Sequence, residues 1–289
     1  MAGFLGTTTS FSIFEAPVPS KLDFEAVRAW AFSDAVTPEG TRLGWVGLGN
    51  AVDTDFSFGI DHGRFAALSL RVDSRKASGA ALKLQLAEAV QEELAQGGNV
   101  SNKRKKELRE AILAKLISKA EWTPALTDCL WDLEKGRLLV AASPKAALPL
   151  LERFTSTFGV DAQPYTPNED LPSFFARLSR ENVSVNGREL SCAGSATLAT
   201  PLHVEGKMAV AVQNNENTIA SALDEGLIIR KLAMIADATL EFSLDTSLTV
   251  SGLKLPRAEK GADMDTDFLL KADVCVMAAD LALAIAGLA

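Results

Sequence analysis

The stretch LWDLEKGRLLV, residues 130–140, decides the fold because it contains a complete β-hairpin signal. Apolar runs, which we extend to Thr127 and Ala142, flank the turn residues Glu134-Lys135-Gly136. Two such runs around a short turn with glycine indicate paired antiparallel strands. Three further stretches share the pattern: residues 56–72 with a turn near Asp61-His62-Gly63, residues 198–212 with a turn at Glu205-Gly206, and residues 240–255 with a turn around Asp245-Thr246-Ser247.

Helical patterns separate the predicted hairpins. Residues 145–158 end at Gly159 and residues 217–225 end at Gly226, and glycine is a common helix stop. The apolar run 274–289 predicts a buried C-terminal helix, because it contains an aspartate and is too short for a membrane span. Hairpins that alternate with helices, without a βαβ rhythm, predict an α+β fold of antiparallel sheets and packed helices.

Two amphipathic helices make up a segment of a different kind. Residues 80–95 and 101–120 both carry apolar side chains at helical spacing. A short break, Gly97-Gly98-Asn99, separates them, so we expect a protruding, antiparallel helical hairpin. We therefore divide the chain into an N-terminal α+β lobe (1–77), the basic helical hairpin (78–122), a β-hairpin with a helix (123–160) and a C-terminal α+β lobe (161–289).

The composition is that of an ordinary globular protein, which excludes a disordered or collagen-like chain. Of 289 residues, 47% are hydrophobic and 23% are charged. Cys129, Cys192 and Cys275 form no CxxC motif, which argues against a disulfide framework or a zinc site and favours buried thiols in a reducing cytoplasm. Residues 1–20 contain no Lys or Arg and no continuous apolar core, so we expect no signal peptide.

Residues that could catalyse a reaction are scarce. The two histidines, His62 and His203, each stand beside a predicted turn, and no G-x-S-x-G elbow is present. Gly44, Gly47 and Gly49 resemble part of a dinucleotide loop, but the third glycine and the following helix are missing. We predict no catalytic residue and no cofactor, and a binding or structural role is favoured by elimination.

Three alternating aspartates, Asp263, Asp265 and Asp267, could suggest a metal site. A calcium-binding loop would then need Gly and Glu at positions that hold Phe268 and Val274. We therefore expect no metal here and interpret the three aspartates as a solvated segment that leads into an apolar run.

Charge is unevenly spread along the chain. Residues 71–119 contain eleven basic and six acidic side chains, a net charge of +5, in a protein whose net charge is −8. A basic patch on an acidic body can be a polyanion footprint, because phosphate contacts release counterions and need no reading of bases. No aromatic residues interleave with the basic run, which favours contacts with a duplex backbone over stacking with single strands.

The predicted phosphate contacts centre on the densest basic run. The primary candidates are Lys103, Arg104, Lys105, Lys106 and Arg109, and the secondary ones are Arg75, Lys76, Lys115 and Lys119. The alternative is that the run is only the solvated tip of a surface helix. Positive charge at a helix start opposes the helix dipole, and this cost hints at another use for the charges.

The order of several short motifs resembles the RdgC family of recombination-associated proteins. The motifs are Ala31-Phe32 with Gly44-Trp45-Val46, the lysine-rich KRKKELREAIL (103–113), the hairpin within 130–143 that contains Leu130-Trp131-Asp132 and Gly136, the helix at 150–159, GLIIRKLAM (226–234), Leu253-Lys254-Leu255, Asp265-Thr266-Asp267-Phe268 and the final helix around Asp280-Leu281. Residues 161–215 match poorly.

The resemblance implies a curved subunit of a ring-shaped homodimer, with double-stranded DNA passing through a basic hole. It also implies binding without sequence preference, a role in restraining RecA-promoted strand exchange, and a cytoplasmic, nucleoid-associated location. The strand after the third turn departs from the family, which usually has Arg and Lys there. Here residues 208–212 are MAVAV beside Lys207, and Arg230 and Lys231 either compensate or serve a structural role.

Three hypotheses follow. The leading one is a non-enzymatic, sequence-independent duplex DNA-binding protein that acts as a ring-shaped homodimer. The second is an acidic dimeric protein-interaction scaffold that has lost most DNA binding, which the neutral strand favours. The third is a metal-dependent nuclease built on the three aspartates. We also expect Trp45 and Trp131 in the core or an interface, and Trp122 and Pro124 at a dimer contact.

Overall fold

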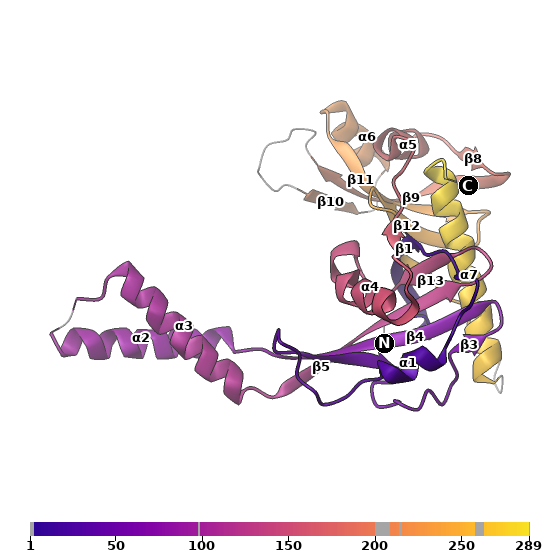
Figure 1. Cartoon of the computed structure of the whole chain (residues 1–289). Helices are drawn as coiled ribbons and strands as arrows, with labels where there is room; N and C mark the ends of the chain where they lie inside the picture. Colours follow the sequence, from indigo (N-terminus) through magenta and orange to yellow (C-terminus); the bar gives the residue numbers. More distant parts are fainter. Residues whose placement is uncertain (1–2, 98, 200–208, 214–215, 258–262, 289) are drawn as a thin grey trace. The chain divides into compact units, whose positions relative to one another are not determined.

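The computed structural model describes residues 3–97, 99–199, 209–213, 216–257 and 263–288, and within it the backbone alone of 209–213 and 216–217 (Figure 1). The strands of the described chain are β1 (Thr8–Glu15), β2 (Arg42–Val46), β3 (Asp61–His62), β4 (Phe65–Arg75), β5 (Trp122–Asp132), β6 (Arg137–Val140), β7 (Gln163–Pro164), β8 (Val183–Val185), β9 (Arg188–Ala199), β10 (Ala209–Gln213), β11 (Ile228–Ala236), β12 (Leu240–Asp245) and β13 (Thr249–Lys254). The helices are α1 (Glu25–Ala29), α2 (Gly79–Ala95), α3 (Asn102–Lys119), α4 (Pro144–Phe158), α5 (Leu171–Leu178), α6 (Glu216–Asp224) and α7 (Met264–Ile285).

The strands form one large antiparallel sheet, which confirms the predicted α+β class. Its main path runs β10-β9-β11-β12-β13-β1-β6-β5-β4-β2, with β3 on β4, β7 on β1 and β8 on β9. Sequence neighbours pair at β5–β6 and β12–β13, as predicted, with Asp132 opposite Arg137 in the first pair. β1 lies between β13 and β6, so the first and the last strand in the sequence are neighbours in the middle of the sheet.

The two remaining hairpins differ from the sequence-based expectation. β9 and β10 pair antiparallel, but the turn predicted at Glu205-Gly206 lies outside the described residues, as does His203. In the first hairpin, β3 contains two residues, so the strand is much shorter than predicted. Phe56 has a φ of 56°, in the left-handed region, and this conformation interrupts an extended strand at the point where we expected one to begin.

The predicted helices agree with the structure except at the start of α7, while α1 and α5 were not predicted. α4 ends at Gly159, whose φ of 67° is the left-handed conformation that glycine supplies after a helix. α7 begins at Met264, ten residues before the apolar run that predicted it. Asp263 explains the difference, because its side chain accepts a hydrogen bond from the backbone N–H of Thr266 and so caps the helix. The expected solvated segment is therefore the cap and first turn of a helix.

The described chain forms two compact units. The sheet unit comprises residues 1–31, 45–70 and 127–289, and the hairpin unit comprises residues 32–44 and 71–126. Every buried hydrophobic side chain of the described residues belongs to the sheet unit. The division into four parts that we made from the sequence stays a prediction.

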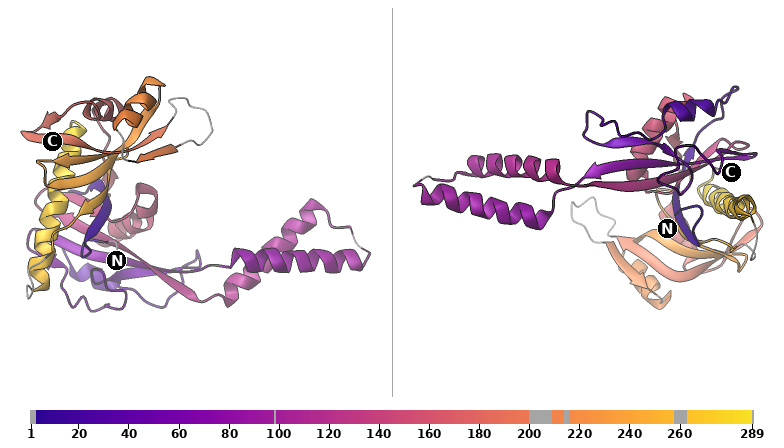
Figure 2. Two further views of the ribbon diagram at one scale, coloured as in Figure 1. Left: turned by 180° about the vertical axis from the view of Figure 1, so that it is seen from behind. Right: turned by 90° about the horizontal axis from the view of Figure 1, so that it is seen from below.

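The core of the sheet unit surrounds α7, which lies along β12 and β13 (Figures 1 and 2). Trp45 and Trp131 are both buried, and their indole N–H groups donate to Thr157 Oγ1 and to the backbone oxygen of Ala16, each at 2.8 Å. These two tryptophans are thus core residues. Cys129 and Cys275 are buried as expected, and burial raises the pKa of both thiols, whereas Cys192 is half-buried.

A buried lysine joins the two ends of the sheet unit. Lys271 of α7 is almost fully buried, and its ammonium donates to the backbone oxygen of Leu5 at 3.0 Å and to Asp267 at 2.6 Å. The neighbouring strand β1 pairs with β13, with Thr8 opposite Lys254. β1 and the segment before it are therefore held by β13 and α7, which belong to the last forty or so residues of the chain.

Candidate nucleic-acid interface

The helical hairpin forms because its two helices have clear starts. The hydroxyl of Ser78 accepts from the backbone N–H of Ala81 at the start of α2, and the hydroxyl of Ser101 accepts from that of Arg104 at the start of α3. Gly97, with a φ of 79°, follows α2 in the conformation that ends a helix. Figures 1 and 2 show α2 and α3 lying side by side within the hairpin unit.

All nine predicted phosphate contacts lie in the hairpin unit. The four residues Lys103–Lys106 occupy the first turns of α3, with Arg109, Lys115 and Lys119 further along it. Arg75 is the last residue of β4, and Lys76 follows it. The structure thus brings the whole predicted set into one compact part of the chain. Their contact with DNA stays a prediction.

Two of the primary candidates are engaged by carboxylates of the hairpin itself. The guanidinium of Arg104 donates twice to Glu93 of α2, at 2.6 and 2.8 Å, and also pairs with Glu107 at 3.3 Å. The hydrogen bond to Glu93 raises the pKa of Arg104. Lys106 lies 3.9 Å from Glu110. Arg104 therefore joins the two helices. This role could not be predicted from the sequence, because neither helix alone determines how its residues align with those of the other.

The other cations of α3 have no carboxylate within ion-pair distance in the described part of the chain; they are Lys103, Lys105, Arg109, Lys115 and Lys119. Because successive residues of a helix advance by about 100°, Lys105 and Arg109 fall on the same side of α3 as Leu116. A hollow of about 380 Å³ is lined by Lys83, Leu86, Ala87, Val90 and Gln91 of α2 and by Lys105 of α3. These unpaired cations carry the charge that a polyanion would meet.

A second basic group in the hairpin unit combines arginine with aromatic rings. The guanidiniums of Arg42 and Arg75 each lie 4.3 Å from the ring centroid of Trp122. Arg71 lies 3.9 Å from the ring of Phe32. Arg42 is not among the predicted contacts, since it meets Trp122 only when strands from three separate segments enter one sheet. The predicted placement of Trp122 and Pro124 at a dimer contact stays untested.

Arg71 differs from its neighbours because a buried carboxylate neutralises it. Its guanidinium makes two hydrogen bonds to Asp73, at 2.6 and 2.7 Å, and Asp73 is only 1% exposed. The hydrogen bond to Asp73 raises the pKa of Arg71. This pair is a structural element of the hairpin unit, and its charge is not available to a ligand.

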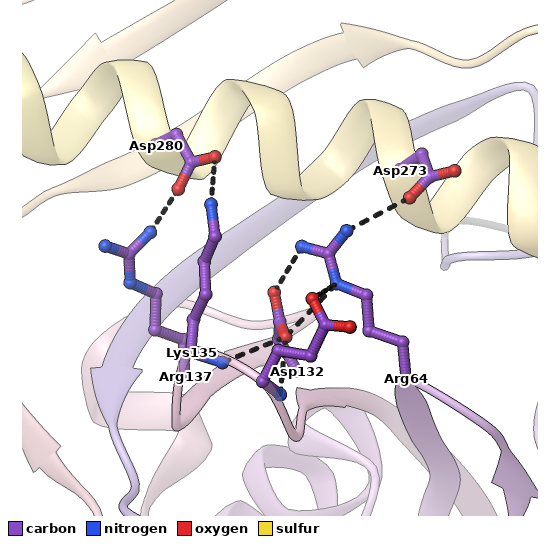
Figure 3. A network of polar contacts seen from close by, with 7 residues as sticks. Arg64, Asp132, Lys135, Arg137, Asp273 and Asp280 are labelled. Carbon is purple, nitrogen blue, oxygen red and sulfur yellow. Dashed lines mark hydrogen bonds and ion pairs between the residues drawn. The ribbon is translucent and has the colours of Figure 1, made fainter.

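Basic residues of the sheet unit that face α7 are paired in the same way (Figure 3). Asp132 is buried and accepts two hydrogen bonds from Arg64, at 2.7 and 3.3 Å, and its Oδ1 also accepts from the backbone N–H groups of the following turn. Asp280 of α7 binds both Lys135 and Arg137. Asp132 and Gly136 therefore build a turn that is tied to α7.

Each of the three alternating aspartates at the start of α7 has a protein partner. Asp263 caps the helix, and the hydrogen bond from the Thr266 backbone lowers its pKa. Asp265 lies 3.3 Å from Nδ1 of His62, and Asp267 pairs with Lys271. Among the residues that the structure describes, no three His, Cys, Asp or Glu side chains are arranged to hold a metal ion.

The remaining sequence features have structural explanations or lie beyond the described side chains. In the glycine loop, the N–H of Gly47 donates to Asp53 and the N–H of Gly49 donates to the hydroxyl of Ser69, and no helix follows. Lys231 donates to Ser251 at 3.0 Å, which favours a structural role. The neutral strand is β10, whose side chains are not described, and Lys207 lies outside the described residues.

The sequence matches a known protein family over nearly its whole length. A family model with the description "RdgC: Putative exonuclease, RdgC" matches residues 12–289, nearly the whole chain. No curated protein matches the sequence. In the described residues, we find no helix with the length and apolar character needed to cross a membrane.

Proposed function

This chain belongs to the RdgC family, and from that premise we propose that it binds double-stranded DNA through phosphate contacts, without sequence preference and without cleaving it. Membership of this family suggests a recombination-associated DNA-binding protein. The finer proposal adds a ring-shaped homodimer around the duplex, modulation of RecA-dependent recombination and a nucleoid-associated location.

The separation of charge is the observation that carries this proposal. The net charge of residues 71–119 is +5 while that of the whole protein is −8, and the hairpin unit contains the whole of that segment. On α3, the cations without a carboxylate partner outnumber those that Glu93, Glu107 and Glu110 engage. Free cations on an acidic protein are the arrangement that would release counterions from a phosphate backbone.

The packing of the helical hairpin supports a homodimer. No side chain of α2 or α3 is buried, and Leu84 and Leu94 are 62% and 53% exposed. Helices of this length gain most of their stability from burial of an apolar face, and two helices alone bury little. A second copy of the hairpin would cover these leucines, so we propose that the hairpins of two protomers contact each other.

A salt titration tests the DNA-binding proposal. Fluorescence anisotropy with a labelled duplex should show affinity that falls steeply with salt, equally for unrelated sequences. The double variant Lys105→Ala with Arg109→Ala should lower the salt slope by about two, since each lost phosphate contact removes about one. The matched control, Lys21→Ala with Lys145→Ala, removes two exposed lysines of the sheet unit and should bind as the wild type does.

The same titration separates the alternatives. A dimer by light scattering that does not bind duplex at low salt would contradict the proposal and favour the protein-interaction scaffold. The family description names an exonuclease, so the labelled duplex should also be incubated with magnesium. We expect intact DNA; degradation that is abolished in Asp265→Asn would instead support the nuclease hypothesis.

A further inference from the structure

We propose that Arg42, Arg75 and Trp122 form a second phosphate-binding site in the hairpin unit, in which the indole positions two guanidiniums for the backbone of a duplex. We name these three residues the Trp122 cluster. The inference rests on the proposed function and adds a site that lies outside the lysine-rich helix. Its components come from three strands: Arg42 from β2, Arg75 from β4 and Trp122 from β5.

The geometry of the cluster is that of two cations held against one ring. Each guanidinium carbon lies 4.3 Å from the centroid of Trp122, a distance at which the ring attracts a cation. Like charges brought to the same ring repel each other, so the arrangement has an electrostatic cost that an anion would relieve. A guanidinium fixed by stacking also loses less entropy when it binds a phosphate.

The hydrogen bonding of the cluster is incomplete. Nε of Arg42 and Nε of Arg75 are two of the five buried side-chain atoms that lack a hydrogen-bond partner in the described residues. The only protein acceptor for Arg75 there is the backbone oxygen of Ser118, at a long 3.4 Å. A buried donor without a partner is costly, and such groups in a native structure call for an explanation.

The charges around the cluster leave a net positive site. Arg42 pairs with Asp34 at 2.6 Å, but Asp34 is 84% exposed, so this ion pair is open to competition by a phosphate. Arg75 has no carboxylate partner in the described part of the chain, and neither has its neighbour Lys76. The nearby Arg71 and Asp73 neutralise each other. Two guanidiniums already stack on the indole, so the ring is not available to stack on a base. We therefore assign a phosphate and not a base as the ligand.

Substitutions within the cluster test the proposal by the salt slope of duplex binding. Arg75→Gln should lower that slope by about one and weaken binding to all sequences equally. Trp122→Leu removes no charge, yet it should also lower the slope, because the guanidiniums lose the surface that positions them. Trp122→Phe keeps a stacking ring and should restore binding close to the wild type.

Arg153→Gln is the matched control. Arg153 lies 4.3 Å from the ring of Trp30, the same distance as in the cluster, but in the sheet unit. We expect no change of slope from this variant. An equal loss in Arg153→Gln would overturn the assignment to the Trp122 cluster, and thermal unfolding of each variant identifies any that fails to fold. If Trp122→Leu does not fold, Arg42→Gln and Trp122→Phe carry the test.

The remaining outcomes separate this inference from the function on which it rests. If Arg75→Gln and Arg42→Gln both bind as the wild type does while the Lys105 and Arg109 double variant binds weakly, the inference is wrong and the proposed function stands. If the wild type ignores duplex at low salt, both are wrong. Tryptophan fluorescence should change on duplex addition and lose that change in Trp122→Phe; the same change with inorganic phosphate alone would assign the site to free anions.

Discussion

The two units of this protein are stabilised in different ways. The sheet unit contains every buried hydrophobic side chain of the described residues, with Trp45, Trp131 and Phe268 among the largest. The hairpin unit contains none, and its fixed contacts are ion pairs and arginines stacked on aromatic rings. Burial of apolar side chains thus stabilises one unit, and contacts of charged side chains stabilise the other. The two units should therefore respond differently to the same kind of substitution.

Truncation of an apolar side chain should show the largest difference between the units. Trp131→Ala removes a buried indole that packs on Phe154 and Phe158, and it should lower the free energy of unfolding by about 4 kcal/mol. Val36→Ala, at an exposed position of the hairpin unit, should change it by less than about 0.5 kcal/mol. Urea unfolding measures both. Equal effects would mean that the hairpin unit has a core of its own.

Loss of a carboxylate should give the next largest difference. Asp132→Ala leaves Arg64 without its bidentate partner and the turn N–H groups without an acceptor, so we expect a loss of about 3 kcal/mol. Asp34→Ala removes the exposed partner of Arg42 in the hairpin unit and should cost less than about 1 kcal/mol. Should the two variants unfold at the same urea concentration, burial would not be what separates the units.

The smallest expected effect is a pH dependence confined to the sheet unit. Burial raises the pKa of Asp128 above its ordinary value of 3.8, against the hydrogen bond from Ser69. A raised pKa means that the folded protein binds this proton more tightly than the unfolded chain does. The contribution of Asp128 is therefore fully present below pH 3.8 and is lost as pH rises through the raised pKa.

Urea unfolding of wild type and Asp128→Asn across this acidic range measures that contribution. The stability of the wild type relative to the variant should fall as the pH rises through the range. A difference that is constant with pH, or that grows as pH rises, would show that Asp128 has the same or a lower pKa in the folded state.

The sequence predicted the elements of both units better than their contacts. The β5–β6 hairpin follows from a glycine-containing turn between apolar runs, and α2 and α3 follow from apolar side chains at helical spacing. These signals are local, which is why they can be read from one segment. The prediction of where α7 begins was wrong because the alternating aspartates resemble a loop. The hydrogen bond that makes Asp263 a cap is visible only in the structure.

Contacts between distant segments could not be predicted for a physical reason. Arg104 and Glu93 meet because two helices adopt one register, and Arg42 reaches Trp122 because three strands enter one sheet. The charge count gave the whole candidate set but could not separate Arg104, which is held by carboxylates, from Lys105, which is not. The sequence therefore located the basic unit, and only the structure ranks its members.

The contact between Lys271 and Leu5 has a consequence for how this protein is made. β1 pairs with β6 and with β13, and the segment before it is held by a lysine of α7, so β1 completes its contacts only after α7 has been synthesised. Until β13 has been synthesised, the edge of β1 that faces it lacks its partner strand. The sheet unit should consequently complete its folding only after synthesis, at a slow rate set by the long separation of its contacts.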